Sequence, residues 1–158
     1  MFERILVPLD GSKVGEAALP VLYQLISKQA PDTKTEITLI GVITLLRHWV
    51  VVGEASAPVS YTDEELKLIK DKVADNLAKV AATINRPNVT VKTIVSAGNA
   101  AEEILKAAAD IGADLIAMST HGRSGLRRLA FGSVTDKVLH GSKIPVLMVR
   151  APEGTRNE

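Results

Sequence analysis

The sequence contains no cysteine, and this absence excludes several kinds of site at once. None of its 158 residues can form a disulfide, a zinc–thiolate site or a cysteine nucleophile. Aromatic residues make up only 3% of the chain, too few for the stacking platform on which single-strand binders hold bases. Because 19 basic residues nearly balance 18 acidic ones, no overall field attracts nucleic acid. We therefore expect no nucleic-acid partner.

Long apolar runs are absent as well. No stretch reaches the roughly 18 uninterrupted apolar residues that a membrane span requires. The first residues, 1–4, lead straight into a strand-like run and lack the architecture of a signal peptide. We expect a cytoplasmic protein without a membrane partner, built as one domain over residues 1–150 and followed by a short disordered tail at 151–158.

What the chain does have is aliphatic residues, in short runs that alternate with helical patterns. Apolar residues amount to 46% of the sequence. Their spacing predicts strands at 5–9, 36–43, 89–95, 115–118 and 145–149, and helices at 12–27, 62–84, 100–111 and 133–139. Thr62 and Glu65 form a capping box for the second helix, Asn99 caps the third, and Ser12 is expected to cap the first. Residues 44–61 show no clean period.

This β-α-β-α-β-α-β-α-β order predicts an α/β fold. Strands that alternate with helices form right-handed crossovers, so we expect an open five-stranded parallel sheet, Rossmann-like, with helices on both faces. Ligands of such sheets lie beyond the carboxyl ends of the strands, where the strand order reverses. The rule directs attention to the residues after the first strand and to those after the fourth.

The segment after the fourth strand has the composition of a phosphate-binding loop. Gly122 and Gly125 permit backbone conformations that turn N–H groups toward an anion. Gly132 and Ser133 open the last helix, whose free N–H groups and dipole favour a phosphate, and Arg123, Arg127 and Arg128 add positive charge. In the alternative interpretation the glycines only turn the chain, Ser133 only caps the helix, and the arginines belong to a solvated face of the loop.

The same loop resembles the signature of the universal stress protein family, G-x2-G-x9-G-[ST]. Here the four positions hold Ser119, Gly122, Gly132 and Ser133, so a serine replaces the first glycine. The resemblance spans the whole chain, because residues 5–12, 113–116 and 143–149 also match the family's pattern. It implies the fold that this family shares with adenine nucleotide alpha hydrolases, and it makes the loop an ATP-binding loop.

The resemblance also implies roles for single residues. Pro8, Leu9 and Asp10 would line the adenosine pocket, with Asp10 placed for ribose hydroxyls or for a water bound to Mg²⁺. An aspartate before a glycine is alternatively a turn-capping residue. Val42 would meet adenine through its backbone, or be ordinary strand core. The full set of expected binding residues is Pro8, Leu9, Asp10, Val42, Met118, Ser119, Gly122, Arg123, Gly125, Gly132, Ser133 and Val134.

The first functional hypothesis is a protein that binds ATP with Mg²⁺ and acts in the stress response as a slow ATPase or a nucleotide-dependent switch. No base or water-positioning residue for phosphoryl transfer is recognisable, and no P-loop or G-x-S-x-G motif is present. The alternative is a nucleotide-free homodimeric interaction module of the same fold, and a weaker one is a hydrolase that uses His121. Either of the first two is expected to form a homodimer through the last strand, Val146, Leu147, Met148 and Val149.

Overall fold

The structure is a computed structural model that describes residues 1–44, 48–52, 55–59, 61–120 and 132–152. Its elements in chain order are β1 (Arg4–Pro8), a 3₁₀ turn (Gly15–Ala17), α1 (Ala18–Ile26), β2 (Thr35–Ile43), β3 (His48–Val52), β4 (Ala55–Val59), α2 (Asp63–Thr83), β5 (Val89–Ala97), α3 (Ala100–Asp110), β6 (Leu115–Ser119), α4 (Ser133–Gly141) and β7 (Val146–Val149).

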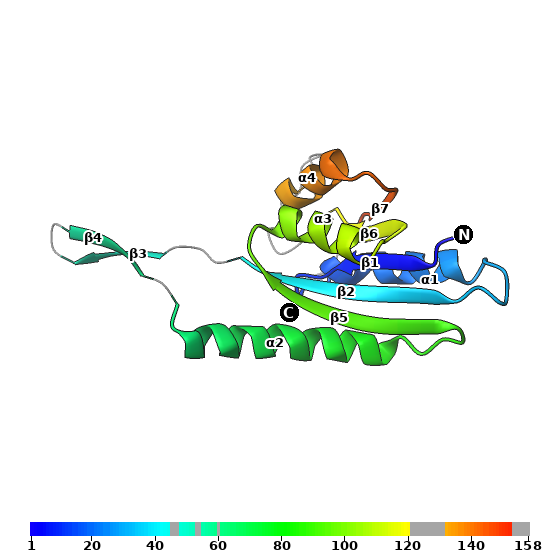
Figure 1. Cartoon of the computed structure of the whole chain (residues 1–158), viewed down its shortest axis with the longest axis horizontal. Helices are drawn as coiled ribbons and strands as arrows, with labels where there is room; N and C mark the ends of the chain where they lie inside the picture. Colours follow the sequence, from blue (N-terminus) through cyan, green and yellow to red (C-terminus); the bar gives the residue numbers. More distant parts are fainter. Residues whose placement is uncertain (45–47, 53–54, 60, 121–131, 153–158) are drawn as a thin grey trace.

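Five of the strands form the parallel sheet that the sequence predicted. Their order is β5-β2-β1-β6-β7, and each neighbouring pair is parallel. The chain moves outward in one direction from β1 to β2 and β5, then returns to add β6 and β7 on the other side (Figure 1). The strand order therefore reverses between β1 and β6, which is where the two segments singled out in the sequence meet.

Helices cover both faces of this sheet, and the alternation of residues along β1 shows how. Ile5 and Val7 pack with α1 and α2 on one face, whereas Leu6 packs with α3 and α4 on the other. All three side chains are completely buried. A strand is apolar wherever both of its sides are covered, which explains the continuous apolar run that starts at Ile5.

The expected helix at 12–27 was wrong at its start. Regular α-helix begins only at Ala18, after the 3₁₀ turn, and Ser12 does not cap it. The Ser12 hydroxyl instead accepts a hydrogen bond from the Gly15 N–H, at 2.9 Å. The later start places Pro20 in the first turn of α1, where a missing N–H costs no intrahelical bond.

The segment at 44–61, which has no clean period, contains a β-hairpin that the sequence did not predict. β3 and β4 pair with each other in antiparallel fashion, from His48 opposite Val59 to Val52 opposite Ala55. They form a separate two-stranded sheet. The predicted capping box is confirmed directly after it, since Thr62 and Glu65 exchange the two hydrogen bonds that define the motif.

Asn99 is confirmed as the cap of α3, because its side chain accepts hydrogen bonds from the N–H groups of Ala101 and Glu102. Within the ranges that the structure describes, no helix has the length and hydrophobicity needed to cross a membrane. Part of the expected tail, residues 153–158, lies outside these ranges.

Candidate functional site

A cleft of about 330 Å³ lies at the carboxyl ends of β1 and β6, on the face of the sheet that α3 and α4 cover. We call it the β1/β6 cleft. Its walls come from both segments that the sequence singled out. They also include the end of β2, the start of α3 and the start of α4. The lining residues are Pro8, Leu9, Asp10, Gly15, Ile40, Val42, Thr44, Ala100, Ile104, Met118, Ser119, Gly132, Ser133, Val134 and Thr135.

One side of the cleft is a tight turn after β1 that is held by its own side chains. The Asp10 carboxylate accepts hydrogen bonds from the Ser12 N–H at 3.0 Å and from the Ser12 hydroxyl at 2.6 Å. A β-carbon at position 15 would collide with the Asp10 carboxylate oxygen, so a larger residue there would displace that carboxylate. Asp10 therefore does cap a turn, as the alternative interpretation held, and the same carboxylate also fronts the cleft.

Ser119 closes the opposite side, and its hydroxyl fastens that side to the turn. The residue ends β6 and is only 7% exposed. Its hydroxyl donates to the carbonyl of Val14 at 2.8 Å and lies 3.2 Å from the carbonyl of Gly15. A glycine at this position cannot form either bond. The serine that departs from the resembled pattern thus ties β6 to the loop after β1, across 105 residues of chain.

The start of α4 supplies the polar end of the cleft. Gly132 is the N-cap residue, and no side chain caps the helix. Ser133 is the first helical residue, so the alternative interpretation of Ser133 as the capping residue was wrong. The first backbone bond of the helix runs from the Asp136 N–H to the Gly132 carbonyl. The N–H groups of residues 133–135 therefore have no acceptor within α4, and they give this end a partial positive charge.

Thr135 keeps the helix in place against the strand. Its side chain is 4% exposed, and its hydroxyl donates to the Ser119 carbonyl at 3.2 Å. The Gly132 N–H also donates to the Thr120 carbonyl, at 3.1 Å. Two hydrogen bonds thus fix the start of α4, and with it the first N–H groups of the helix, against the end of β6.

The other end of the cleft is apolar. Ile40 and Ile104 are buried, and Val42 packs against the same cluster as Ile104. Ala100 opens α3 at this point and leaves space because its side chain is small. The cleft therefore has a polar, electropositive end at α4 and an apolar end at β2 and α3, with Asp10 among the residues that front it.

Nine of the binding residues predicted from the sequence line this cleft, namely Pro8, Leu9, Asp10, Val42, Met118, Ser119, Gly132, Ser133 and Val134. Gly122, Arg123 and Gly125, like His121, lie outside the described residues. The lining residues that the sequence analysis missed are Gly15, Ile40, Thr44, Ala100, Ile104 and Thr135. A usable signal existed for two of them, because Ala100 and Ile104 are four apart on the predicted third helix and share a face.

Asp10 is the one ionisable side chain among the described residues that line the cleft. Across the described ranges, no three acidic or histidine side chains gather closely enough to hold a metal ion. This donor set does not provide a protein cage for Mg²⁺. It fits only an ion whose other ligands are phosphate oxygens and water, which is the arrangement that Mg²⁺ commonly adopts with phosphates.

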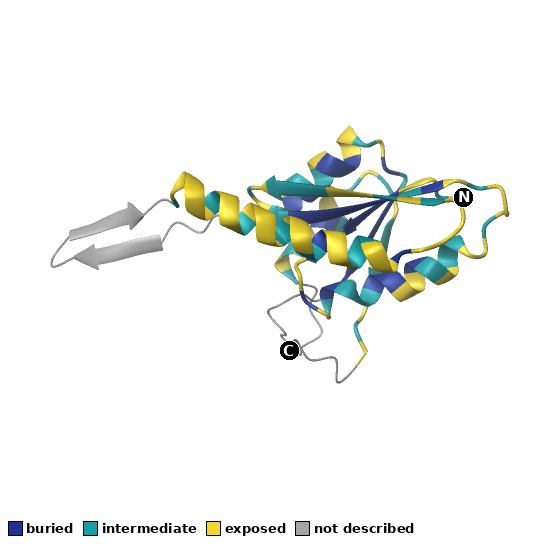
Figure 2. Ribbon diagram, turned by 90° about the horizontal axis from the view of Figure 1, so that it is seen from below, coloured by how far each residue is buried: buried dark blue, intermediate teal, exposed yellow. Residues whose placement is uncertain are grey.

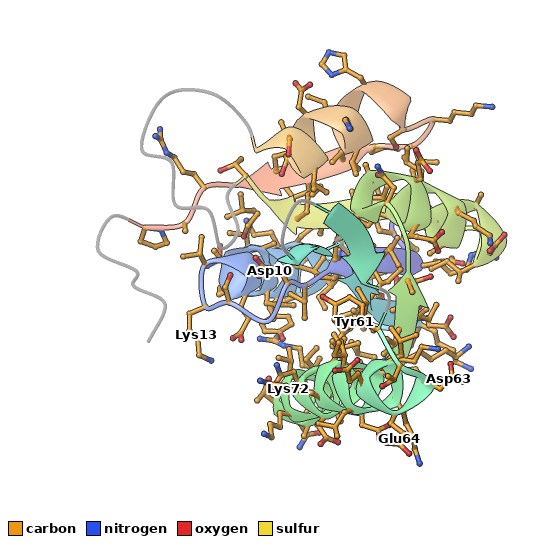
Figure 3. The ribbon with its side chains drawn as sticks, turned by 90° about the vertical axis from the view of Figure 1, so that its left-hand side faces the viewer. Asp10, Lys13, Tyr61, Asp63, Glu64 and Lys72 are labelled. Carbon is orange, nitrogen blue, oxygen red and sulfur yellow. The ribbon has the colours of Figure 1, made fainter. Side chains whose placement is uncertain are left out.

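A second, larger cavity of about 750 Å³ lies between the sheet and α2, and we call it the α2 cavity. Its apolar wall is one face of α2, formed by Ile69, Val73, Leu77 and Val80. At the rim, the Lys13 ammonium and the Glu16 carboxylate form an ion pair at 3.1 Å. Figure 3 looks at this end of the molecule, where Lys13 and Tyr61 lie on the sheet side of the space above α2.

Comparison with known proteins gives a consistent result. Residues 1–150 match the family described as the universal stress protein family. The universal stress protein YxiE of Bacillus subtilis is 33% identical over 95% of this chain and 100% of its own length. The structure of MJ0577 from Methanocaldococcus jannaschii superimposes with a TM-score of 0.66 at 27% identity, and covers 98% of this chain and 99% of that one.

A more distant structure shares the fold. A universal stress protein family protein from Arabidopsis thaliana, solved with AMP bound, has a TM-score of 0.62 at 13% identity. The match covers 99% of each chain.

Proposed function

The chain belongs to the universal stress protein family, and on this premise we propose that it binds an adenine nucleotide, ATP with Mg²⁺, in the β1/β6 cleft. One observation carries the proposal. Predicted binding residues from three distant parts of the sequence line a single cleft, at the point where the strand order reverses. The AMP-bound Arabidopsis protein of the same fold supports an adenine nucleotide as the ligand.

The two ends of the cleft give the nucleotide a direction. The phosphates lie at the start of α4, where the N–H groups of residues 133–135, which have no acceptor within α4, and the helix dipole favour negative charge. Binding of phosphate by Gly122, Arg123 and Gly125 stays a prediction from the sequence, because these residues lie outside the described part of the chain. The base lies at the apolar end, against Val42, and the Asp10 carboxylate accepts hydrogen bonds from the ribose hydroxyls. The nucleotide thus spans the cleft from α4 to β2.

Magnesium would enter with the nucleotide. When bound, it would neutralise part of the phosphate charge, and a water in its coordination sphere would reach Asp10. Asp10 already accepts two hydrogen bonds from Ser12, which fixes the carboxylate in place before a ligand arrives. This role is indirect, because a single carboxylate is too few ligands to hold the ion without phosphates.

Chemically, the cleft is better suited to retaining a nucleotide than to cleaving it. Rapid phosphoryl transfer needs a residue that positions or deprotonates the attacking water. Among the described lining residues only Asp10 is ionisable, and in the proposed orientation its carboxylate is occupied by ribose hydroxyls or by a magnesium-bound water. We therefore propose a stress-response protein that hydrolyses ATP slowly or not at all and changes its partners with the nucleotide it holds.

The direct test is to extract nucleotide from freshly purified protein and identify it by mass spectrometry. The melting temperature is then measured with and without Mg-ATP. We expect retained adenine nucleotide, or a rise in melting temperature that grows with ATP concentration, because a ligand of the native state stabilises it. Protein that carries no nucleotide and gains no stability from Mg-ATP would overturn the proposal.

A homodimer through β7 belongs to the same proposal. β7 is an edge strand of the sheet, and its four residues, Val146, Leu147, Met148 and Val149, are all half-buried in the single chain. An apolar edge of this kind favours pairing with a second copy. Light scattering should give about twice the chain mass of 16.8 kDa, and a monomer at micromolar concentration would refute this part.

A further inference from the structure

The β1/β6 cleft and the α2 cavity meet at the carboxyl ends of β1 and β2. They share four lining residues, Leu9, Asp10, Val42 and Thr44. Leu9 and Asp10 directly follow β1, and Thr44 directly follows β2. Beyond its last hydrogen-bonded residues a sheet no longer separates its two faces, so spaces on opposite faces can join there. The shared residues lie at this edge.

The shared residues lie at the base end of the cleft. The phosphate end, at Gly132 and Ser133, fronts the β1/β6 cleft but not the α2 cavity. Val42 and Thr44, which belong to the opposite, apolar end, front both. A nucleotide in the proposed orientation therefore presents the far edge of its purine toward the α2 cavity. In adenine that edge carries the N6 amino group.

The α2 cavity has the character of a receptor for an apolar group. The apolar part of its wall on α2 is formed by Ile69, Val73, Leu77 and Val80, at steps of four, four and three residues. The charged residues that line it are two acidic and two basic ones, Asp10, Glu16, Lys13 and Lys79, so their formal charges cancel. The volume of about 750 Å³ lies within the range of about 300–1,000 Å³ that small-molecule sites commonly have. An alkyl or aryl group would bury its surface against the apolar side chains of α2.

We propose that this site takes adenine nucleotides with an apolar substituent on N6, such as an alkyl or benzyl group, and that the substituent lies in the α2 cavity. The inference rests on the proposed function, because it needs the nucleotide in the β1/β6 cleft with its base at Val42. It goes further by naming a ligand class, the N6-substituted adenine nucleotides, and by giving the larger cavity a role.

The experiment compares N6-benzyl-ATP with ATP by isothermal titration of the full chain. We expect N6-benzyl-ATP to bind about tenfold more tightly, because the benzyl group transfers apolar surface from water to the face of α2. If ATP binds but N6-benzyl-ATP binds equally or more weakly, this inference fails and the proposed function stands. If neither nucleotide binds, the proposed function fails, and this inference fails with it.

A plugged cavity supplies the specific control. Val80→Trp fills the α2 cavity from a residue that does not line the β1/β6 cleft. It should abolish the advantage of N6-benzyl-ATP and leave the affinity for ATP within about twofold, a change that is small against the tenfold scale. The matched control is Leu68→Trp, at a position on the same helix that is 73% exposed, and it should change neither affinity.

Ile69→Trp plugs the same cavity from another position, and circular dichroism and the melting temperature show which plugged variant is folded. An advantage of N6-benzyl-ATP that survives in a folded plugged variant would place the substituent elsewhere and overturn the inference.

Discussion

α3 and α2 cover opposite faces of one sheet, yet they pack against it differently. α3 has 11 residues, and four of them are buried, namely Ala101, Ile104, Ala107 and Ala108. α2 has 21 residues, of which only Leu77 is buried, and its surface is exposed along most of its length (Figure 2). Three alanines let α3 lie close to the strands. α2 instead packs with a half-buried face, and the α2 cavity lies between that face and the sheet.

The two cavities follow from this contrast. The β1/β6 cleft, on the side of α3, is small, and hydrogen bonds from Ser119 and Thr135 hold its walls together. The α2 cavity is more than twice as large and is mostly apolar along α2. Gly41 marks the closest approach of α2, because a β-carbon there would lie 2.5 Å from a methyl group of Val73.

The largest effect should come from truncating the closely packed helix. Ile104→Ala removes a side chain that is 2% exposed and should lower the free energy of unfolding by about 2–5 kcal/mol. Val73→Ala, on the half-buried face of α2, should cost less than about 1 kcal/mol, since less apolar surface is lost. Urea unfolding measures both. Equal losses would contradict the contrast between the helices.

The next effect concerns Gly41. Gly41→Ala brings a methyl group against Val73, and the resulting displacement of α2 should cost about 1–3 kcal/mol. Combining it with Val73→Ala removes the clashing group, so the double variant should be more stable than the sum of the two single losses predicts. A double-mutant cycle by chemical denaturation measures this coupling. Strict additivity would show that α2 does not approach Gly41 as described.

A smaller effect is expected at Ser119. Ser119→Ala removes the hydroxyl that bonds to the carbonyls of Val14 and Gly15, and should cost about 1–2 kcal/mol of stability. Ser119→Gly, which restores the family pattern, also loosens the backbone of β6, so it should be the less stable of the two. Titration with ATP should show no gain in affinity for either variant. A large gain for the glycine variant would mean that the serine obstructs the cleft.

The smallest effect is a pH dependence of the free energy of unfolding, which arises from Tyr23 in α1. Burial raises the pKa of the Tyr23 phenol above its ordinary value, while Thr83 and Arg86 beside it act in the opposite direction. The protonated phenol is thus favoured in the folded state. Its contribution to stability is complete below the unfolded pKa of about 10 and is lost as the pH rises through the higher folded value.

Tyr23→Phe tests this sign. Urea midpoints of the parent chain should fall between about pH 8 and pH 10.5, and those of the variant should fall less, because phenylalanine has no proton to lose. Identical pH profiles would show that Tyr23 does not carry the effect.

Sequence patterns were reliable wherever local chemistry decides the structure. The apolar runs located the five strands of the sheet, and Thr62 with Glu65 located the start of α2, because caps and burial act over a few residues. The start of α1 was misplaced because a serine hydroxyl can cap a helix or stabilise a turn. The Ser12 hydroxyl bonds within the turn, to Asp10 and to the Gly15 N–H. The hairpin of β3 and β4 was missed because its two strands form a sheet of their own. Their sequences therefore lack the periodic apolar pattern by which the strands of the main sheet were recognised.

The candidate site divides in the same way. Glycines and polar residues after β1 and β6 are visible in a sequence, because backbone freedom and charge belong to residue types. Ile40 and Thr135 front the cleft only because two elements distant in sequence come together, and no local pattern indicates this. The hydrogen bond from Ser119 to Val14 likewise joins residues that are far apart in sequence, so the sequence alone does not predict that Ser119 forms it.

We propose that ATP binds in the β1/β6 cleft and not in the α2 cavity. Titration calorimetry of Mg-ATP against the parent chain, Ala100→Trp and Val80→Trp distinguishes the two, since each tryptophan plugs one of the two spaces. We expect the parent chain and Val80→Trp to bind ATP alike, and Ala100→Trp to bind it at least about tenfold more weakly. Binding that survives in Ala100→Trp and is lost in Val80→Trp would contradict it.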